Sequence, residues 1–486
     1  MNLLEVFYQQ VEKQPEHPLI FGPEDENVYS YKDFSQVIQI LIEEIKTIGI
    51  KSGSCIGLHY PNGYQYISLT YALWGCGAIV VPIPVELTIA EKQKIFENIR
   101  IDAVISNTGI ASDFKALQTS TSIPFSENTV LIPVKQLRDQ PTGLENLNAA
   151  FVRFTSGTTG TAKGVVLSHE TIYERIVAAN KGLQIGSNDS IIWLLSMAYH
   201  FTVSIVAYLS FGATIVFCKN HFGSTIINTA ARHKATIIYG APTHYELMTH
   251  DQGSELLPDL RLAITTTTSL RKEVGTAFYK RFKKPLNETY GIIEVGLPCM
   301  NIEKPLEKNG SVGCLLPDYE MQLEKIGVES GLRLIKLRGV GTVDAYYEPW
   351  KTREEILQGN NGWFSTGDLG YVDDEGYLYI RGRSKEMISV GGMKFFPQEV
   401  ELVLESHPAI QEACVFGSRD KRLGEIPYTQ LVKASEYDSI PNEDELKDFC
   451  ASCLAIYKVP KMFEFVDSLT RTASGKLIRD ASKLLK

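Results

Sequence analysis

AIVVPIPVELTIAEKQKIFENIRIDAVIS, residues 78–106, contains two short apolar runs separated by a longer stretch rich in charged residues. The runs AIVVPI (78–83) and DAVIS (102–106) have the continuous apolar character of strands buried on both faces of a sheet. Between them, IAEKQKIFENI (89–99) has a helical pattern. This order of strand, helix and strand is typical of an α/β protein with mainly parallel sheets.

The same pattern extends to both sides of this unit. Further apolar runs of strand length are IGLHY (56–60), SIIWLL (190–195), ATIVF (213–217) and ATIIYG (235–240). HETIYERIVAANKGL (169–183) is another helical stretch. The alternation predicts an α/β fold: a large domain whose mainly parallel sheets are flanked by helices.

The residues after Asp368 have a different pattern, which begins with short strands and tight turns in YVDDEGYLYIRGR (371–383). Helical and strand-like segments then follow in a compact α+β order: PQEVELVLES (397–406), EACVFGS (412–418), YTQLVKA (428–434), EDELKDFCASCLA (443–455) and MFEFVD (462–467). Charge is dense and apolar periodicity lapses in IRGRSKEM (380–387), as in an interdomain boundary. We therefore expect a large domain over residues 1–382 and a small domain over residues 383–486.

Composition excludes several classes of protein. The 486 residues are 44% hydrophobic and 22% charged, as in ordinary globular proteins, and a net charge of −9 argues against a nucleic-acid partner. The N-terminus lacks a basic start before an apolar core, so we expect no signal peptide, and no apolar stretch is long enough to span a membrane. The eight cysteines have no repeated spacing, which is typical of reduced thiols in a cytoplasmic protein. Cys450 and Cys453 form one isolated CxxC pair, a weak signal for metal or redox chemistry.

FTSGTTGTAKGVVLSH (154–169) is the strongest local motif. Its glycines allow backbone N–H groups to approach phosphate oxygens, while its hydroxyls and lysine add donors and positive charge. The candidate phosphate-binding residues are Thr155, Ser156, Gly157, Thr158, Thr159, Gly160 and Lys163. A Walker P-loop does not fit, because Gly164 instead of Ser or Thr follows Lys163 and the next residues are strand-like.

TSGTTGTAKG (155–164) resembles the signature of the acyl-adenylate-forming superfamily, which includes acyl- and aryl-CoA synthetases, peptide synthetase adenylation domains and luciferases. Other stretches resemble elements of that superfamily in its order: YSYKDF (29–34), WGCGAIVVPI (74–83), YGIIE (290–294), STGDLGYVDDEGYLYIRGR (365–383), YKVPK (457–461) and RTASGK (471–476). The resemblance covers nearly the whole chain. It implies that ATP and a small-molecule carboxylic acid form an acyl-adenylate, with Mg²⁺ as cofactor. The acyl group would then pass to coenzyme A or to the phosphopantetheine of a carrier protein supplied in trans.

The resemblance also implies roles for nucleotide-binding residues. Tyr290 would stack on adenine, and Glu294 would help to hold the magnesium ion, which prefers oxygen ligands. Asp368 would accept both ribose hydroxyls, and Arg383 would bind ribose or phosphate. The alternatives are a turn-forming role for Asp368 and a solvated hinge charge for Arg383.

The small domain would be mobile, turning about Lys385 between one pose for each half-reaction. In the first pose Lys476 would enter the active site and oppose the negative charge that gathers between carboxylate and α-phosphate. Thr155 and Glu294 would act beside it in catalysis. Lys476 could instead lie on the face of a terminal helix.

The acid itself is poorly specified. SMAYHFTVS (196–204) lacks the aspartate that pairs with the amino group in amino-acid-activating relatives, so an uncharged acyl or aryl acid is favoured. His200 would line the acyl pocket and act in catalysis, unless it is a core histidine. Gly291 would border the same pocket. Thr266 and Thr267 stand where relatives have glycines and should narrow it.

Two other departures concern phosphate geometry and a structural element. Ile293 replaces a threonine, which removes a hydroxyl that would contact the AMP phosphate, and GLRLIKLRG (331–339) lacks the family's G-E-L. Alternative functions are an amide-forming ligase, a stand-alone amino-acid adenylation enzyme, a luciferase-like oxidation and a catalytically inactive nucleotide-binding regulator. Retention of Lys476, Glu294 and Asp368 argues against the last of these.

Overall fold

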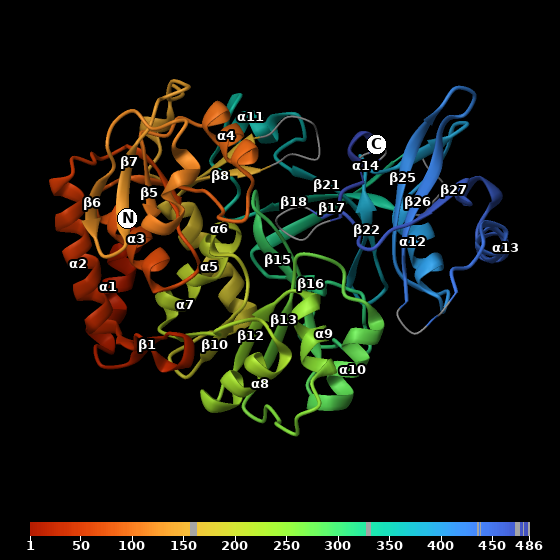
Figure 1. The fold of residues 1–486 in the computed structure, drawn as a ribbon, viewed down its shortest axis with the longest axis horizontal. Coiled ribbons are helices and arrows are strands. Elements are labelled where there is room, and N and C mark those ends of the chain that lie inside the picture. Colours follow the sequence, from red (N-terminus) through yellow and green to blue (C-terminus); the bar gives the residue numbers. More distant parts are fainter. Residues whose placement is uncertain are drawn as a thin grey trace. The chain divides into compact units, whose positions relative to one another are not determined.

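The computed structural model describes residues 1–155, 163–326, 332–434, 437, 439–471, 477–479 and 481–484. Two compact units are present (Figure 1). The first contains Met1–Glu320 and Leu337–Phe364, and the second contains Met321–Lys336 and Ser365–Lys486. The domain boundary expected at residue 383 stays a prediction.

One nine-stranded sheet of the first unit has the order β16-β15-β14-β13-β12-β10-β11-β1-β2. Its strands are β1 (Pro18–Phe21), β2 (Tyr29–Ser30), β10 (Ser190–Trp193), β11 (Thr214–Phe217), β12 (Ile237–Gly240), β13 (Leu262–Thr265), β14 (Leu286–Ile292), β15 (Gly296–Met300) and β16 (Cys314–Leu315). Six neighbouring strands run parallel: β14, β13, β12, β10, β11 and β1. Antiparallel strands lie at both edges, with β2 beside β1 and with β15 and then β16 beside β14. The helices α8 (Gly223–Arg232), α9 (Pro242–His250) and α10 (Lys272–Phe282) follow β11, β12 and β13 and lie together along this sheet (Figure 1).

The second nine-stranded sheet has the order β20-β19-β9-β8-β4-β3-β5-β7-β6. Its strands are β3 (Cys55–His59), β4 (Ile79–Pro82), β5 (Ala103–Asn107), β6 (Ile123–Ser126), β7 (Thr129–Pro133), β8 (Ala149–Thr155), β9 (Lys163–Ser168), β19 (Ala345–Tyr347) and β20 (Trp350–Thr352). β3 pairs in parallel with both β4 and β5, so the strands predicted within 78–106 lie on either side of β3 in the parallel part of this mixed sheet. The predicted α/β fold with a smaller second domain is confirmed.

Local sequence explains where the helices of this unit begin. α1 (Leu3–Lys13), α2 (Tyr31–Thr47) and α4 (Ile89–Asn98) each start at a capping box, made by Asn2 with Glu5, Ser30 with Asp33 and Thr88 with Glu91. α5 (His169–Leu183) is capped by the Ser168 side chain. α3 (Tyr64–Gly75) is buried from Tyr66 to Trp74, which explains why it is apolar on every face.

The second unit is built on two smaller sheets. Their orders are β17-β18-β21-β22 and β24-β23-β26-β25, with β27 paired to β26. The strands are β17 (Tyr319–Lys325), β18 (Arg333–Gly339), β21 (Phe364–Val372), β22 (Leu378–Arg383), β23 (Ile388–Val390), β24 (Met393–Phe395), β25 (Ile410–Asp420), β26 (Gly424–Lys433) and β27 (Met462–Phe465). α12 (Pro397–Glu405) and α13 (Glu443–Cys453) cover the five-stranded sheet and share its apolar core.

The structure also tests the predictions about the cysteines and about membrane-spanning segments. Cys450 packs in the core of the second unit and Cys453 is exposed, and none of the eight cysteines is joined in a disulfide. Within the described ranges, no cluster of His, Cys, Asp and Glu could hold a metal ion, and no helix is long and apolar enough to cross a bilayer.

Candidate active site

The predicted phosphate loop joins two antiparallel strands. β8 and β9 pair with Phe154 opposite Gly164 and Thr155 opposite Lys163. A strand, a loop and a second strand differ from the strand–loop–helix of a Walker P-loop, so the structure agrees with the rejection of that motif. The residues between these strands, which include Ser156, Gly157, Thr158, Thr159 and Gly160, lie outside the described residues.

Tyr346 links the lysine of this hairpin to the predicted magnesium ligand. β19 pairs with β9, with Tyr346 opposite Val165. The Lys163 Nζ lies 4.2 Å from the centroid of the Tyr346 ring, within the range of a cation–π interaction. The Tyr346 hydroxyl lies close enough to the Glu294 carboxylate to interact with it, and burial together with that carboxylate raises the pKa of the phenol. Two residues predicted to act on phosphate and magnesium are thus brought to one aromatic ring.

A buried arginine holds the backbone around Glu294. Arg175, on α5, is 1% exposed and donates from Nη1 to the Ile293 carbonyl at 2.7 Å, and from Nε to the Gly341 carbonyl. The Val343 N–H donates to the Glu294 carbonyl at 2.7 Å. Burial lowers the pKa of Arg175 to about 10, so the guanidinium stays charged at neutral pH. Arg175 therefore fixes the turn that presents Glu294.

Tyr290 and Gly291 lie on β14, just before this turn. Tyr290 is 8% exposed and pairs with Cys299 of β15, and the register shifts between Tyr290 and Ile292. Gly291 is exposed, and a Cβ there would lie 2.8 Å from the Gly296 carbonyl oxygen. The stacking role of Tyr290 and the pocket role of Gly291 stay predictions.

The ends of parallel strands gather the predicted acyl-pocket residues. Trp193, at the end of β10, stacks on Tyr239 of β12 with ring centroids 5.4 Å apart. His200, the last residue of α6 (Met197–His200), presents its ring edge-on at 6.3 Å from each of them. The Tyr239 hydroxyl also interacts with the side chain of Thr266, which follows β13. Ligands of open α/β sheets bind at such carboxyl ends.

Thr267 has an unusual backbone conformation. Its φ is +81°, in the left-handed region that a β-branched residue rarely adopts. Relatives were expected to have glycine here, and glycine occupies this region without steric cost. The position therefore keeps a glycine-like backbone while carrying a threonine side chain.

In the second unit, Asp368 and Arg383 are directly opposite each other on β21 and β22. The Arg383 Nε lies 3.0 Å from Asp368 Oδ1, and Asp368 is 4% exposed. The Asp368 N–H donates to Thr366 Oγ1 at 3.0 Å, which fixes the local backbone. The structure thus brings together the two residues to which ribose binding was assigned.

The predicted hinge and the predicted catalytic lysine belong to the same unit. Lys385 is exposed in a turn closed by the Glu386 N–H and the Arg383 carbonyl at 3.0 Å. Lys476 lies outside the described residues. Arg479, soon after it in the chain, donates to both oxygens of Glu401 at 2.9 and 2.8 Å and lies 3.3 Å from Glu386. The residue after the predicted hinge is therefore tied to the segment that follows Lys476.

Comparison with known proteins identifies the family. Residues 7–330 match the family described as "AMP-binding enzyme", and residues 399–476 match "AMP-binding enzyme C-terminal domain". This chain is an AMP-binding enzyme. The predicted membership of the acyl-adenylate-forming superfamily is confirmed.

Relatives of this AMP-binding enzyme include acid–CoA ligases. It is 30% identical to the 2-succinylbenzoate–CoA ligase of Bacillus licheniformis over 90% of each chain. It is 27% identical to the sulfoacetate–CoA ligase of Cupriavidus necator over 96% of this chain and 94% of that one. The o-succinylbenzoate CoA synthetase of Bacillus subtilis has the same fold, with a TM-score of 0.84, 24% identity and coverage of 99% and 98% of the two chains.

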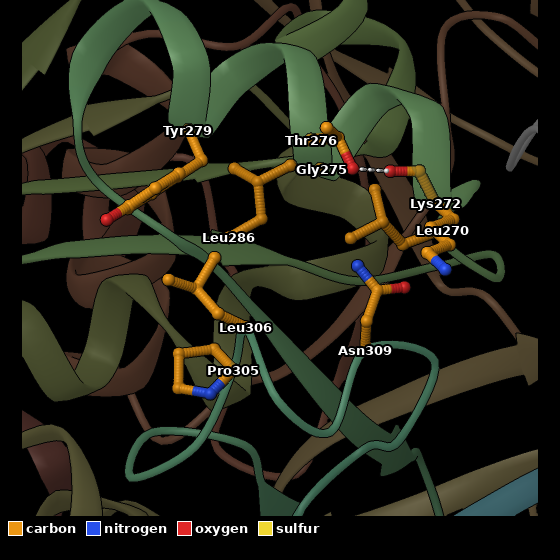
Figure 2. Close-up of a pocket in the computed structure, with 9 residues that line it drawn as sticks. All are labelled: Leu270, Lys272, Gly275, Thr276, Tyr279, Leu286, Pro305, Leu306 and Asn309. Carbon is orange, nitrogen blue, oxygen red and sulfur yellow. Dashed lines mark hydrogen bonds between the residues drawn. The ribbon is translucent and has the colours of Figure 1, made fainter.

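One cavity of this AMP-binding enzyme is lined by none of the predicted site residues. It has a volume of about 120 Å³ between α10 and the segment from Pro305 to Asn309 (Figure 2). Figure 2 shows Leu270, Leu286 and Leu306 approaching one another there. Binding sites for small molecules usually measure about 300–1,000 Å³, so this cavity is too small for a nucleotide. None of its lining residues was predicted to take part in function.

Proposed function

We propose that this AMP-binding enzyme activates a carboxylic acid with ATP and then transfers the acyl group to coenzyme A. In the first half-reaction a carboxylate oxygen attacks the α-phosphorus, pyrophosphate leaves and acyl-AMP forms. In the second, the thiolate attacks the acyl carbon and AMP leaves. The observation that carries the proposal is the meeting of Lys163 and Glu294 at Tyr346, beside the hairpin of the hydroxyl-rich loop.

These residues fit a magnesium–phosphate site. A single carboxylate with substrate phosphates is a common set of oxygen ligands for Mg²⁺, and Glu294 offers that carboxylate. Bound there, the ion would neutralise phosphate charge. Lys163 would oppose charge on the phosphates, and Lys476 would act on the charge that develops between carboxylate and α-phosphate. The nucleotide contacts assigned to residues 156–160, Tyr290, Asp368 and Arg383 belong to the same proposal.

The pocket favours an acyl or aryl acid over an α-amino acid. Trp193, Tyr239 and His200 present aromatic edges and faces, and SMAYHFTVS (196–204) offers no carboxylate for an ammonium group. Burying an unpaired ammonium would be costly. Coenzyme A is the proposed acceptor because the relatives named above are CoA ligases. A carrier-protein phosphopantetheine and an amine are the alternative acceptors.

The proposal is tested by incubating the full chain with ATP, MgCl₂, a panel of acids and either coenzyme A, a phosphopantetheinylated carrier protein or an amine. We expect AMP and an acyl-CoA thioester in the first mixture. A thioester formed only on the carrier, or an amide formed only with the amine, would replace coenzyme A as the acceptor. Formation of ADP in place of AMP would refute the adenylation chemistry.

A further inference from the structure

Arg153 lies where the phosphate-loop hairpin meets the acyl pocket. It belongs to β8, the strand that leads into the loop, and its Nη1 donates to the Tyr199 carbonyl at 2.6 Å. Its guanidinium carbon lies 5.1 Å from the centroid of the Tyr199 ring. Tyr199 directly precedes His200, so these two contacts hold the arginine against the pocket segment.

The edge of the Arg153 side chain that usually binds a carboxylate has no protein acceptor. Nε is buried and makes no hydrogen bond within the described parts of the chain. The only hydrogen bond that the guanidinium makes there is the one from Nη1. The Glu294 carboxylate interacts with Arg153 electrostatically, but no described carboxylate lies within the 4.0 Å of an ion pair. Nε and Nη2 form the edge that receives a carboxylate through two parallel hydrogen bonds. The side chain as a whole is only partly buried, although Nε itself is not exposed.

Other unpartnered donors surround the same segment. The Tyr66 hydroxyl is buried without an acceptor among the described residues, its ring lies 5.6 Å from that of Phe201, and it interacts electrostatically with Arg153. Trp193 Nε1 is likewise buried without a described acceptor, and its ring lies 6.3 Å from that of His200. Buried donors in folded proteins are normally paired, so a cluster of unpaired donors indicates a ligand rich in acceptors.

We propose that the acid activated by this enzyme carries a second acidic group, a carboxylate or sulfonate remote from the reacting one, and that Arg153 binds this group. The inference rests on the proposed function and narrows its substrate class. It replaces the uncharged acid expected from SMAYHFTVS, because the pocket segment has a cation beside it.

Arg153 is better suited to a second anion than to the reacting carboxylate. The reacting oxygen must attack phosphorus, and a bidentate ion pair on it would stabilise the ground state and not the transition state. The phosphates are already assigned to the loop, Lys163 and the ion at Glu294. Arg153 contacts the residue before His200, so the group that it binds belongs to the acyl part of the substrate.

The test compares matched pairs of acids in acid-dependent exchange of labelled pyrophosphate into ATP. Suitable pairs are hexanoate with adipate, benzoate with phthalate or 2-succinylbenzoate, and acetate with sulfoacetate. For the wild-type enzyme, kcat/KM for at least one dianionic acid should exceed that of its monoanionic partner by about 10- to 100-fold, as expected for a charged hydrogen-bonded pair. Preference for the monoanion in every pair would overturn the inference.

Variants of Arg153 test whether this residue causes the preference for the dianionic acid. Arg153→Met should abolish the preference for the dianion while leaving kcat/KM for the monoanion and KM for ATP within about twofold, and Arg153→Lys should retain part of the preference. Arg232→Met, which changes an arginine that is 57% exposed, is the matched control and should behave as wild type. Equal loss for both acids of a pair, or a raised KM for ATP, would assign Arg153 to the phosphates or to structure.

Two outcomes separate this inference from the proposed function. Exchange that depends on acids but ignores the second anion refutes the inference alone. Absence of exchange with every acid refutes the proposed function. If Arg153→Met does not fold, the wild-type pairs and Arg153→Lys still decide.

Discussion

Tyr346→Phe should weaken the response of the enzyme to magnesium without displacing Lys163. The substitution removes the hydroxyl that interacts with the Glu294 carboxylate but keeps the ring over which Lys163 Nζ lies at 4.2 Å. Tyr347→Phe is a matched control, because Tyr347 is the next residue of β19 and its hydroxyl accepts from the Arg100 backbone N–H at 3.2 Å. Consecutive side chains of a strand point to opposite faces, so the two hydroxyls serve different partners.

The expected sizes follow from these contacts. Each substitution removes the polar hydroxyl of a buried tyrosine from its partner and should lower the free energy of unfolding by about 0.5–3 kcal/mol. Only Tyr346→Phe removes a neighbour of the carboxylate proposed to hold the ion, and loss of such an outer-shell partner typically costs about 10- to 100-fold in metal affinity or activity. In acid-dependent pyrophosphate exchange at saturating ATP, the half-maximal Mg²⁺ concentration should rise by that factor for Tyr346→Phe and stay unchanged for Tyr347→Phe. The same Mg²⁺ dependence in both variants would refute the assignment of Glu294 to the metal.

Three further predictions concern strain, the half-reactions and pH. The φ of Thr267 is +81°, so Thr267→Gly should relieve backbone strain and raise the free energy of unfolding by up to about 1 kcal/mol in urea titrations. The same variant should admit bulkier acids. A lower free energy of unfolding would contradict the presence of backbone strain at this residue. Lys476→Ala should lose acyl-AMP formation by about 100- to 1000-fold yet transfer acyl from preformed acyl-AMP, and Lys385→Pro should do the reverse; equal losses in both steps for Lys476→Ala would refute the two-pose scheme. Burial lowers the pKa of His59 and of His169 to about 4, so below about pH 6.5 the unfolded chain binds protons that the folded chain does not. Stability should therefore fall between pH 6.5 and 4, and a flat profile in urea titrations would contradict these assignments.

The architecture could be predicted from sequence because its signals are local. The apolar runs at 56–60, 78–83 and 102–106 coincide with β3, β4 and β5, and the helical stretch 169–183 coincides with α5. Continuous apolar strands alternating with helices permit few arrangements other than parallel sheets. The phosphate-loop hairpin was also foreseeable, because strand-like residues stand on both sides of it.

The supporting residues of the site could not be found in this way. Tyr346, Arg175 and Arg153 lie in ordinary strand or helix sequences, and no motif marks them. Their roles arise from pairing between distant segments, such as β19 with β9, and from backbone carbonyls such as that of Ile293. An arginine in the apolar strand AAFVRFT (149–155) was the one available signal, since a strand so apolar rarely contains an unpaired cation.

The most direct test of the account is exchange of labelled pyrophosphate into ATP by the purified full chain. The exchange should require both a carboxylic acid and Mg²⁺, and should vanish when either is omitted, because it reverses the formation of an acyl-adenylate. Hydrolysis of ATP at full rate without any acid, and without exchange across a broad acid panel, would contradict the account.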